Sequence, residues 1–491
     1  MSAIPVAVPS APSLLRLRGS DGFVAPAARV RDLPGPRPLP VVGNTFAMKP
    51  GSMHTAVEDW VREYGPMYKL RLGPMTSVVI ADPVLIGEVL RHRPVGFARG
   101  KKLVDVINEI ATPGLFTAEG ERWRRQRKLV MRALTPEAIR HFFPTIRTVT
   151  GRLLAKWQAA SAEGRAVDVT RDLKRYSIDV TTWLSMGVDV DTLNHPENPL
   201  QSDVELWFET VGRRFRSPLP YWRWIRLPAD RRADEALGRL RDTMEKLIAD
   251  ARAGLDADPS LRARPRNILE ALIVARDEPG SEFTDDDVTG NVGTLLFAGE
   301  DTAANAMAWQ LMHLATSPDH AARAAAQVDE VRAGAPLVQS FADLERLDYV
   351  EATAVESMRL KPIAPLQGAM ALVEADLAGL RIEPGQVLTL AWRPGAMDPR
   401  LFDEPRRFEP QRWTGEHAES ADDTRRKIFP FGAGPRYCPG RYLAMVEMKM
   451  VAAAALGNFR LSLEADADAV VEHLTFTMGP ERLPIRFEPR R

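Results

Sequence analysis

Cys438, the only cysteine of the 491-residue chain, lies in a loop where its sulfur could bind a metal ion. Two prolines and three glycines surround it within residues 431–440, and a helical pattern follows over residues 441–456. The free N–H groups and the dipole at a helix N-terminus favour a thiolate, which soft metals prefer as a ligand. A lone cysteine is more often a small buried apolar side chain, so the thiol alone leaves both interpretations open.

The residues around Cys438 decide between them. One thiolate cannot build a zinc site or an iron–sulfur cluster, but it can be the single protein ligand of an iron held by four porphyrin nitrogens. The pattern Phe-x-x-Gly-x-Arg-x-Cys-x-Gly over residues 431–440 resembles the haem-ligand loop of the cytochrome P450 family. The resemblance implies haem b with Cys438 as iron ligand and Arg436 on a haem propionate. The haem-binding residues that it implies here are Phe431, Gly432, Arg436, Cys438 and Gly440.

A second candidate haem contact lies on a helix predicted from Gly120 to about residue 135. Trp123 and Arg127 are four residues apart and therefore share one face of this helix. They resemble the Trp-x-x-x-Arg motif of the family, which implies that both bind a haem propionate. Other basic residues of the helix either form a solvated surface or, as a group, dock an acidic electron donor. These residues are Arg124, Arg125, Lys128 and Arg132.

The longest predicted helix begins at Thr284, where Thr284-x-x-Asp287 forms a capping box, and ends at Ser317-Pro318. About 32 residues with a rise of roughly 1.5 Å each would span nearly ~50 Å. Glycines such as Gly299 weaken the helix, and close packing against another helix is the simplest reason for them.

The middle of this helix, residues 298–302, resembles the oxygen-binding segment Ala/Gly-Gly-x-Asp/Glu-Thr of the same family. The resemblance implies that the small Ala298 and Gly299 leave room over the haem. It also implies that an acid and a hydroxyl manage protons, and the candidate catalytic residues are Glu300, Asp301 and Thr302.

Three charged residues are predicted to support the haem loop without taking part in catalysis. Glu356-x-x-Arg359 lies on an amphipathic helix, and such a pair alone usually belongs to the surface. Residues 408–413 resemble a later segment of the family that contributes a further arginine, here Arg412. The resemblance implies an ionic triad of Glu356, Arg359 and Arg412.

Two positions depart from the family pattern. Many relatives carry an arginine and a histidine, both usually near a haem propionate, where this chain has Ala369 and Ala396. We therefore expect the chain to rely more on Trp123, Arg127 and Arg436, with Arg393 as a possible substitute.

The composition limits the partners and the compartment. The 65 basic and 65 acidic side chains cancel, which predicts no nucleic-acid partner. No apolar run of about 20 residues marks a membrane span near the N-terminus. A single cysteine excludes an intramolecular disulfide and fits a reducing compartment, so we expect a cytoplasmic protein. Residues 1–32, rich in Pro and Ala, predict a disordered leader, with an organelle transit peptide as the alternative.

The remaining patterns complete the predicted fold. They indicate a helix over residues 53–63, a β-hairpin over 67–80, helices over 136–215, an exposed connection over 251–266 and β-structure over 377–390. With the family resemblance they imply one haem domain over 33–491, mainly α with a small β region (α+β). In this cytochrome P450 fold the haem lies between the long helix and the helix after Cys438.

The function that the resemblance implies is that of a soluble, bacterial-type haem–thiolate monooxygenase. One oxygen atom of O₂ would enter a lipophilic molecule by hydroxylation or epoxidation. A separate ferredoxin or flavodoxin-type protein would supply the electrons, and a monomer is expected. The alternatives are an isomerase or peroxygenase, which usually lacks the acid–alcohol pair, and a haem-based sensor, which would carry a signalling module. The expected pocket walls are mainly apolar: residues 104–116, 207–215, 295–298, 363–366 and 475–478.

Overall fold

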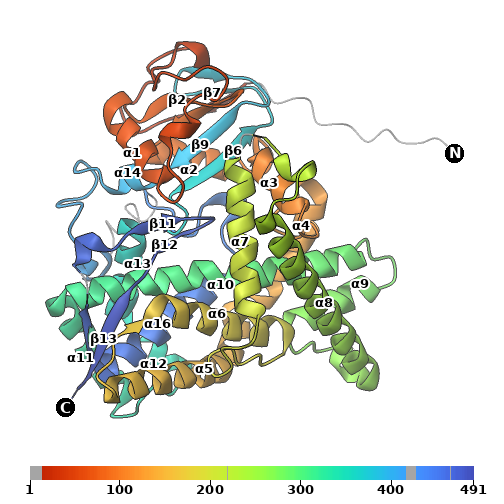
Figure 1. Ribbon diagram of the computed structural model, residues 1–491, viewed down its shortest axis with the longest axis vertical. Helices are drawn as coiled ribbons and strands as arrows, with labels where there is room; N and C mark the ends of the chain where they lie inside the picture. Colours follow the sequence, from red (N-terminus) through yellow and green to blue (C-terminus); the bar gives the residue numbers. More distant parts are fainter. Residues whose placement is uncertain (1–13, 218, 416–426, 465, 491) are drawn as a thin grey trace.

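A helix of 32 residues, α10 (Asp285–Thr316), crosses the molecule and organises the elements around it (Figure 1). This computed structural model describes residues 14–217, 219–415, 427–464 and 466–490. The hydroxyl of Thr284 accepts from the backbone N–H of Asp287, and the Asp287 carboxylate accepts from the N–H of Thr284. This capping box confirms the predicted start of the long helix.

The described part of the chain is mostly helical, as expected for the predicted α+β class. The helix after the cysteine loop, α16 (Arg441–Asn458), and the Glu356 helix, α13 (Asp348–Leu360), both pack on α10, as does α6 (Val169–Met186). The other described α-helices are α1 (Met53–Tyr64), α2 (Pro83–Arg91), α3 (Lys101–Asn108), α4 (Gly120–Ala133), α5 (Pro136–Ala162), α7 (Leu200–Arg216), α8 (Pro228–Ala257), α9 (Ile268–Asp277), α11 (Pro318–Arg332), α12 (Phe341–Glu345) and α14 (Arg393–Ala396). No helix in the described ranges combines the length and apolar character needed to cross a membrane.

Gly299 explains how α6 and α10 come so close. A Cβ atom built on Gly299 would lie 2.4 Å from the hydroxyl oxygen of Thr181 on α6. Any side chain there would push the two helices apart, so close packing is one reason for this glycine.

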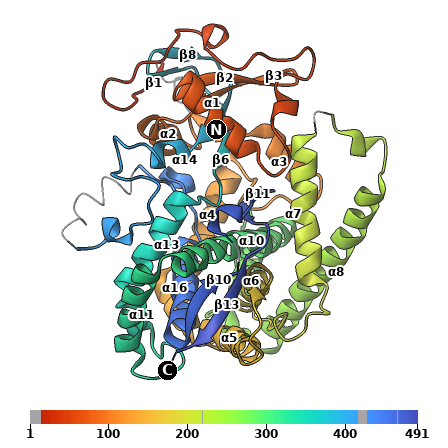
Figure 2. The same cartoon turned by 60° about the vertical axis from the view of Figure 1, so that its left-hand side comes forward.

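The sheets formed by residues 15–99 and 366–391 lie at one end of the molecule, above the helical part, whereas the strands of residues 459–463 and 484–489 lie among the helices (Figures 1 and 2). The largest sheet has the order β2-β3-β9-β6-β4, and smaller sheets have the orders β1-β7-β8, β10-β13-β5 and β11-β12. The predicted hairpin is present as β2 and β3. The strands are β1 (Leu15–Leu17), β2 (Met67–Leu72), β3 (Met75–Ile80), β4 (Phe97–Arg99), β5 (Val167–Asp168), β6 (Leu366–Ala371), β7 (Ala375–Leu377), β8 (Leu380–Ile382), β9 (Val387–Ala391), β10 (Phe459–Leu463), β11 (Glu472–Leu474), β12 (Met478–Pro480) and β13 (Pro484–Pro489).

Two expectations about connecting segments need correction. Residues 14–32, expected to belong to a disordered leader, are ordered: β1 pairs in parallel with β7, and Leu17 is buried. Leu17 packs in the apolar cluster of the sheet, which the low complexity of the segment concealed. Residues 1–13 lie outside the described part. The segment over residues 251–266 is mostly exposed, as expected, but its first part is not a connection, because α8 continues to Ala257.

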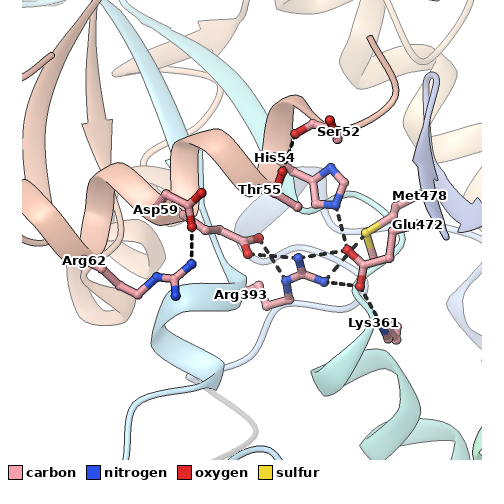
Figure 3. A network of polar contacts seen from close by, with 10 residues as sticks. Ser52, His54, Thr55, Asp59, Arg62, Lys361, Arg393, Glu472 and Met478 are labelled. Atoms are coloured by element: carbon pink, nitrogen blue, oxygen red, sulfur yellow. Dashed lines mark hydrogen bonds and ion pairs between the residues drawn. The ribbon is translucent and has the colours of Figure 1, made fainter. Parts of the chain in front are cut away.

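A buried charge network ties the sheet to the helical part (Figure 3). Arg393 on α14 donates to Glu58 on α1 at 2.9 Å and to Glu472 on β11 at 2.7 Å. Glu472 also contacts Nε2 of His54 at 2.8 Å and accepts from Lys361 at 2.5 Å. Four segments far apart in the sequence are thus held together around the β11–β12 hairpin.

Candidate active site

A cavity of about 1480 Å³ lies between α10 and the cysteine loop. Its wall on the α10 side contains Ala298, Gly299 and Thr302, and its wall on the loop side contains Cys438 and Gly440. The structure therefore brings the two most specific sequence motifs, separated by about 136 residues, to one space. Phe431, Gly432, Arg436, Trp123 and Arg127 line the same cavity.

The backbone of the cysteine loop depends on Gly434. Its φ is +67°, and a Cβ atom there would lie 2.3 Å from the carbonyl oxygen of Leu90 on α2. Only glycine fits such a left-handed conformation with such a close contact. The loop is closed by the N–H of Cys438, which donates to the carbonyl of Phe431 at 2.8 Å.

Burial raises the pKa of the Cys438 thiol, which corrects the expectation that the helix N-terminus alone produces a thiolate. The N–H groups of Gly440 and Arg441 and the charge of Arg127 lower the pKa, but they offset only part of the burial effect. A coordinating metal ion deprotonates a thiol outright. The site thus favours the thiolate only together with a metal.

Trp123, Arg127 and Arg436 lie at one end of the cavity, as predicted. The guanidinium carbon of Arg436 lies 4.5 Å from the centre of a Trp123 ring, and that of Arg127 lies 4.6 Å from the ring of Tyr437. Arg436 donates to the carbonyl of Ala118 at 2.8 Å and pairs with Glu119. The Nη2 of Arg127 and the Nε of Arg436 are buried without a hydrogen-bond partner.

Two further arginines, which the sequence did not reveal, line the same end of the cavity. Arg93 is 3% exposed, and Arg99 is half-buried, with its guanidinium carbon 3.8 Å from the centre of the Phe116 ring. The Nε and Nη2 of Arg93 and the Nε of Arg99 lack partners. Burial lowers the pKa of Arg93 to about 10, with a further contribution from the nearby positive charge of Arg436. Burial and the charges of Arg93 and Arg436 likewise lower the pKa of Arg99.

The pairing of β4 with β6 explains why Ala369 can replace the arginine that many relatives carry. Arg99 lies directly opposite Ala369 in this antiparallel pair. The family pattern places an arginine at the position of Ala369 on β6. In this chain the cation is Arg99, on the neighbouring strand β4. Arg393 does not serve as the substitute, because Glu58 and Glu472 bind its guanidinium group.

The donor set fits a haem. Arg93, Arg99, Arg127 and Arg436 line the cavity, and Glu119 is the one carboxylate that offsets them. Unpaired buried guanidinium groups are costly, so this end of the cavity calls for anionic partners. The two carboxylates of a haem meet that demand, and the Cys438 thiol supplies a ligand for its iron.

Asp301 on α10 faces away from the cavity into a polar network. One of its oxygens accepts from the hydroxyl of Thr477, and the other lies 3.4 Å from Nζ of Lys174. Asn305 donates to the same Thr477 hydroxyl at 2.9 Å, and Lys174 donates to Glu205 at 3.1 Å. Burial disfavours the charge on Lys174, but Asp301, Glu300 and Glu205 outweigh it and raise its pKa.

Thr302 and Glu300 differ in how they relate to the cavity. Thr302 lines it, and its hydroxyl donates to the carbonyl of Ala298 at 2.7 Å. Glu300 is fully buried beside the Asp301 network, does not line the cavity, and neither of its carboxylate oxygens has a partner. Burial, reinforced by the charge of Asp301, raises the pKa of Glu300 well above its usual range.

The residues of the predicted triad are in contact. Arg359, which is 1% exposed, donates to both oxygens of Glu356 at 2.8 Å, and Arg412 donates to one of them at 3.3 Å. Glu356 also accepts from Trp413 and from the backbone of Glu409, both at 2.9 Å. Arg359 further donates to the carbonyl of Ala396 at 2.7 Å. The triad thus fastens α13 to the segment that precedes the cysteine loop.

Aromatic side chains form the distal wall of the cavity. Trp207 on α7 stacks on Phe297 of α10, with ring centroids 4.1 Å apart. Phe208 and Phe476 pack at the edge of this pair, and Phe476 also contacts Phe116. A wall of this kind suits an apolar substrate.

Comparison with known proteins agrees with this geometry. A family model described as Cytochrome P450 matches residues 33–487. Cyclooctatin synthase of Streptomyces melanosporofaciens is 30% identical over 91% of this chain and 94% of its own length. Pentalenene oxygenase of Streptomyces avermitilis is 28% identical over 93% and 97%. Carotene epsilon-monooxygenase, chloroplastic, of Arabidopsis thaliana is 28% identical over 87% and 79%. The chain belongs to the cytochrome P450 family and is a haem–thiolate monooxygenase.

Proposed function

We propose that this chain binds haem b through Cys438 and oxygenates a lipophilic molecule, by hydroxylation or epoxidation, in the cytoplasm. The observation that carries the proposal is the cavity that Cys438 and Thr302 line from opposite sides. Arg93, Arg99, Arg127 and Arg436, with Trp123, hold the haem carboxylates. When bound, the haem supplies the activation of O₂ and the oxygen transfer, and a thiolate ligand favours cleavage of the O–O bond.

The substrate class follows from the distal wall and from the relatives. Trp207, Phe208, Phe297 and Phe476 offer an apolar surface that excludes water from the reacting carbon. Three relatives are named for cyclooctatin, pentalenene and carotene, which are terpenoids. A terpenoid skeleton is therefore the substrate class that this cavity is expected to accept.

Thr302 and Asp301 are proposed to deliver the protons that oxygen activation consumes. The Thr302 hydroxyl donates to the Ala298 carbonyl, and its oxygen retains acceptor capacity toward the cavity. Asp301 and the Thr477 hydroxyl form a polar chain that ends at Lys174 and Glu205. Thr477 itself lines the cavity, so rotation of its hydroxyl would connect this chain to the cavity.

Thr302→Val tests this proton route and the monooxygenase function together. Valine keeps the shape and removes the hydroxyl, so substrate should still bind while reducing equivalents are released as hydrogen peroxide. Because positioned proton transfer contributes about 10²–10⁴-fold, we expect product per electron pair to fall at least ~10-fold. Electrons consumed, product and peroxide are measured together in a reconstituted system.

Asp301→Asn is the companion variant, and it should slow the whole cycle because it interrupts proton supply. An unchanged product-to-peroxide ratio in Thr302→Val, with lowered haem content or stability, would mean that the hydroxyl only braces α10 against the Ala298 carbonyl. Thr182→Val is a matched control, since its hydroxyl also donates to a backbone carbonyl four residues earlier, at 2.8 Å, but lies on α6 and does not line the cavity.

The electron donor is proposed to be a separate acidic protein of the ferredoxin or flavodoxin type that docks on α4. The buried face of α4 contacts the cysteine loop through Arg127 and Trp123. On its exposed face, Arg124 pairs with Glu121 and Arg125 pairs with Glu282. Lys128 and Arg132 remain exposed, and neither forms an ion pair with the rest of the described chain. The docking surface is therefore narrower than the four residues expected.

Lys128→Glu combined with Arg132→Glu should slow reduction by the donor about 10-fold at low salt, because charge steering changes association rates by 10-fold or more. The salt dependence should flatten, since ions screen these charges within about 8–10 Å near physiological strength. Stopped-flow reduction measures both. The control is Arg231→Glu with Arg232→Glu on α8, which makes the same charge change. If dithionite reduction slows equally, the substitutions have damaged the fold and give docking on α4 no support, whereas unchanged reduction by the donor refutes it.

A further inference from the structure

The rim of the cavity between α3 and α7 carries two cations without an anionic partner. Arg216, the last residue of α7, and Lys102, the second residue of α3, both line the cavity. Nζ of Lys102 donates to the carbonyl of Ser217 at 2.8 Å, which places it beside the end of α7. Within the described ranges neither side chain has a carboxylate partner.

The other cations of the same two helices each have an acid nearby, although Arg214 lies 4.0 Å from Asp230 and its Nε and Nη2 lack a hydrogen-bond partner. Lys101 pairs with Asp105 at 2.7 Å, and Arg213 pairs with Asp230 at 2.7 Å. Glu109, the acidic residue that directly follows α3, is bound by Arg223 and Trp222. Arg216 and Lys102 thus stand out as charges that nothing in the described protein neutralises.

The position of Arg216 argues against a role in stabilising the helix end. Cations near a helix C-terminus are favourable when they approach its last carbonyl groups. The Arg216 guanidinium instead lies back over Gly212, where a Cβ atom would be 3.0 Å from its Nη1 and 3.5 Å from the backbone of Thr475. Thr475 also lines the cavity, so the guanidinium lies where the hairpin tip faces α7.

Arg216 is half-buried, so its unpaired charge is costly in the absence of a ligand, whereas Lys102 is exposed at the rim. Desolvation lowers the pKa of both side chains, and no carboxylate of the described residues offsets it. From this rim, the apolar wall of Val211, Phe208 and Phe297 leads toward Thr302.

We infer that the substrate carries a carboxylate, which Arg216 binds with the help of Lys102 at the rim. The planar fork of an arginine matches a carboxylate, and one arginine with one partly engaged lysine suits a single negative charge. The apolar body of such a molecule would extend along the aromatic wall. The substrate is thus a lipophilic carboxylic acid. This inference rests on the proposed oxygenase function of the same cavity.

Matched pairs of molecules test this inference on the haem-containing protein. Dodecanoate is compared with 1-dodecanol, and the rigid diterpene acid abietate with its alcohol abietinol, by calorimetric titration at low and high salt. We expect at least one acid to bind about 10-fold more tightly than its alcohol, a difference of ~1.4 kcal/mol. This preference should shrink at high salt.

Arg216→Gln should remove the preference for the acid. The affinity for the acid should fall about 10-fold, and the affinity for the alcohol should not change. Lys102→Gln should have a smaller effect because its ammonium is shared with Ser217. Lys101→Gln, one residue away and paired with Asp105, is the matched control and should change nothing. Arg216→Lys keeps the charge and loses the planar fork, so its preference for the acid should be intermediate. This variant replaces Arg216→Gln in the test if Arg216→Gln folds poorly.

Equal affinities of acid and alcohol in both pairs, or no detectable binding of either acid, would overturn the inference. Equal weakening of acid and alcohol by Arg216→Gln would also overturn it, because that result indicates a packing role. The titration requires no turnover. A protein that oxygenates neutral molecules without acid preference would therefore refute the carboxylate and leave the proposed function intact.

Discussion

Cys438→His should abolish the strongly red-shifted absorption band that reduced, CO-bound haem shows when its ligand is a thiolate. The physical reason is that imidazole donates less electron density to iron than a thiolate does. Cys438 is the one cysteine of the chain, so no other thiol can replace it. We also expect oxygenation to become undetectable, even where the variant retains haem. Absorption spectra and haem content of the purified variant measure both.

The control for this experiment lies in the same loop. Tyr437→Phe removes a hydroxyl that contacts the sulfur of Met131 at 3.9 Å and also interacts with Arg127, while Cys438 is unchanged, so the thiolate band should persist. Cys438→Ser distinguishes loss of ligation from loss of fold, because serine is nearly isosteric with cysteine. A normal thiolate band in Cys438→His would refute the assignment of the ligand.

Glu356→Gln should cause the largest loss of stability of any single charge change considered for this chain. Glu356 is fully buried and accepts from Arg359, Arg412, Trp413 and the backbone of Glu409. Removing its charge leaves the guanidinium of Arg359, 1% exposed, without a counter-ion. Breaking one partner of a buried ion pair typically costs about 3–5 kcal/mol. Urea unfolding of the haem-containing protein measures the loss.

The outer member of the triad provides the comparison. Arg412 makes one longer contact of 3.3 Å and is partly exposed, so Arg412→Gln should cost about 1 kcal/mol or less. Glu356→Gln combined with Arg359→Met should recover part of the stability, because the unpaired charge is removed. A loss from Glu356→Gln no greater than that from Arg412→Gln would contradict a structural triad.

The motifs that lie within one local element were readable from the sequence because neighbouring residues determine their geometry. Trp123 and Arg127 share a helix face by spacing alone, and both reach the cavity. The capping box at Thr284 and the stop at Ser317 bound α10 as predicted. The left-handed backbone at Gly434, with a φ of +67°, is a local requirement for glycine in the loop around Cys438. In each case the physical requirement is met by residues close in sequence.

Contacts between distant segments could not be predicted in this way, because many partners along the chain were equally compatible with each side chain. The pairing of β4 with β6 places Arg99 opposite Ala369, so the missing arginine is replaced from another strand. The same kind of contact engages Arg393 with Glu58 and Glu472, which removes it as a haem contact.

The sequence by itself determined the family, the haem-ligand cysteine as a candidate and the long helix, since these depend on residue types at short, defined spacings. Only the tertiary structure decided which charges are neutralised, because an ion pair depends on distance and burial. It separated Arg124 and Arg125, which have acidic partners, from Lys128 and Arg132, which remain exposed. It also left Arg216 at the cavity rim without a carboxylate, a property that no single stretch of sequence contains.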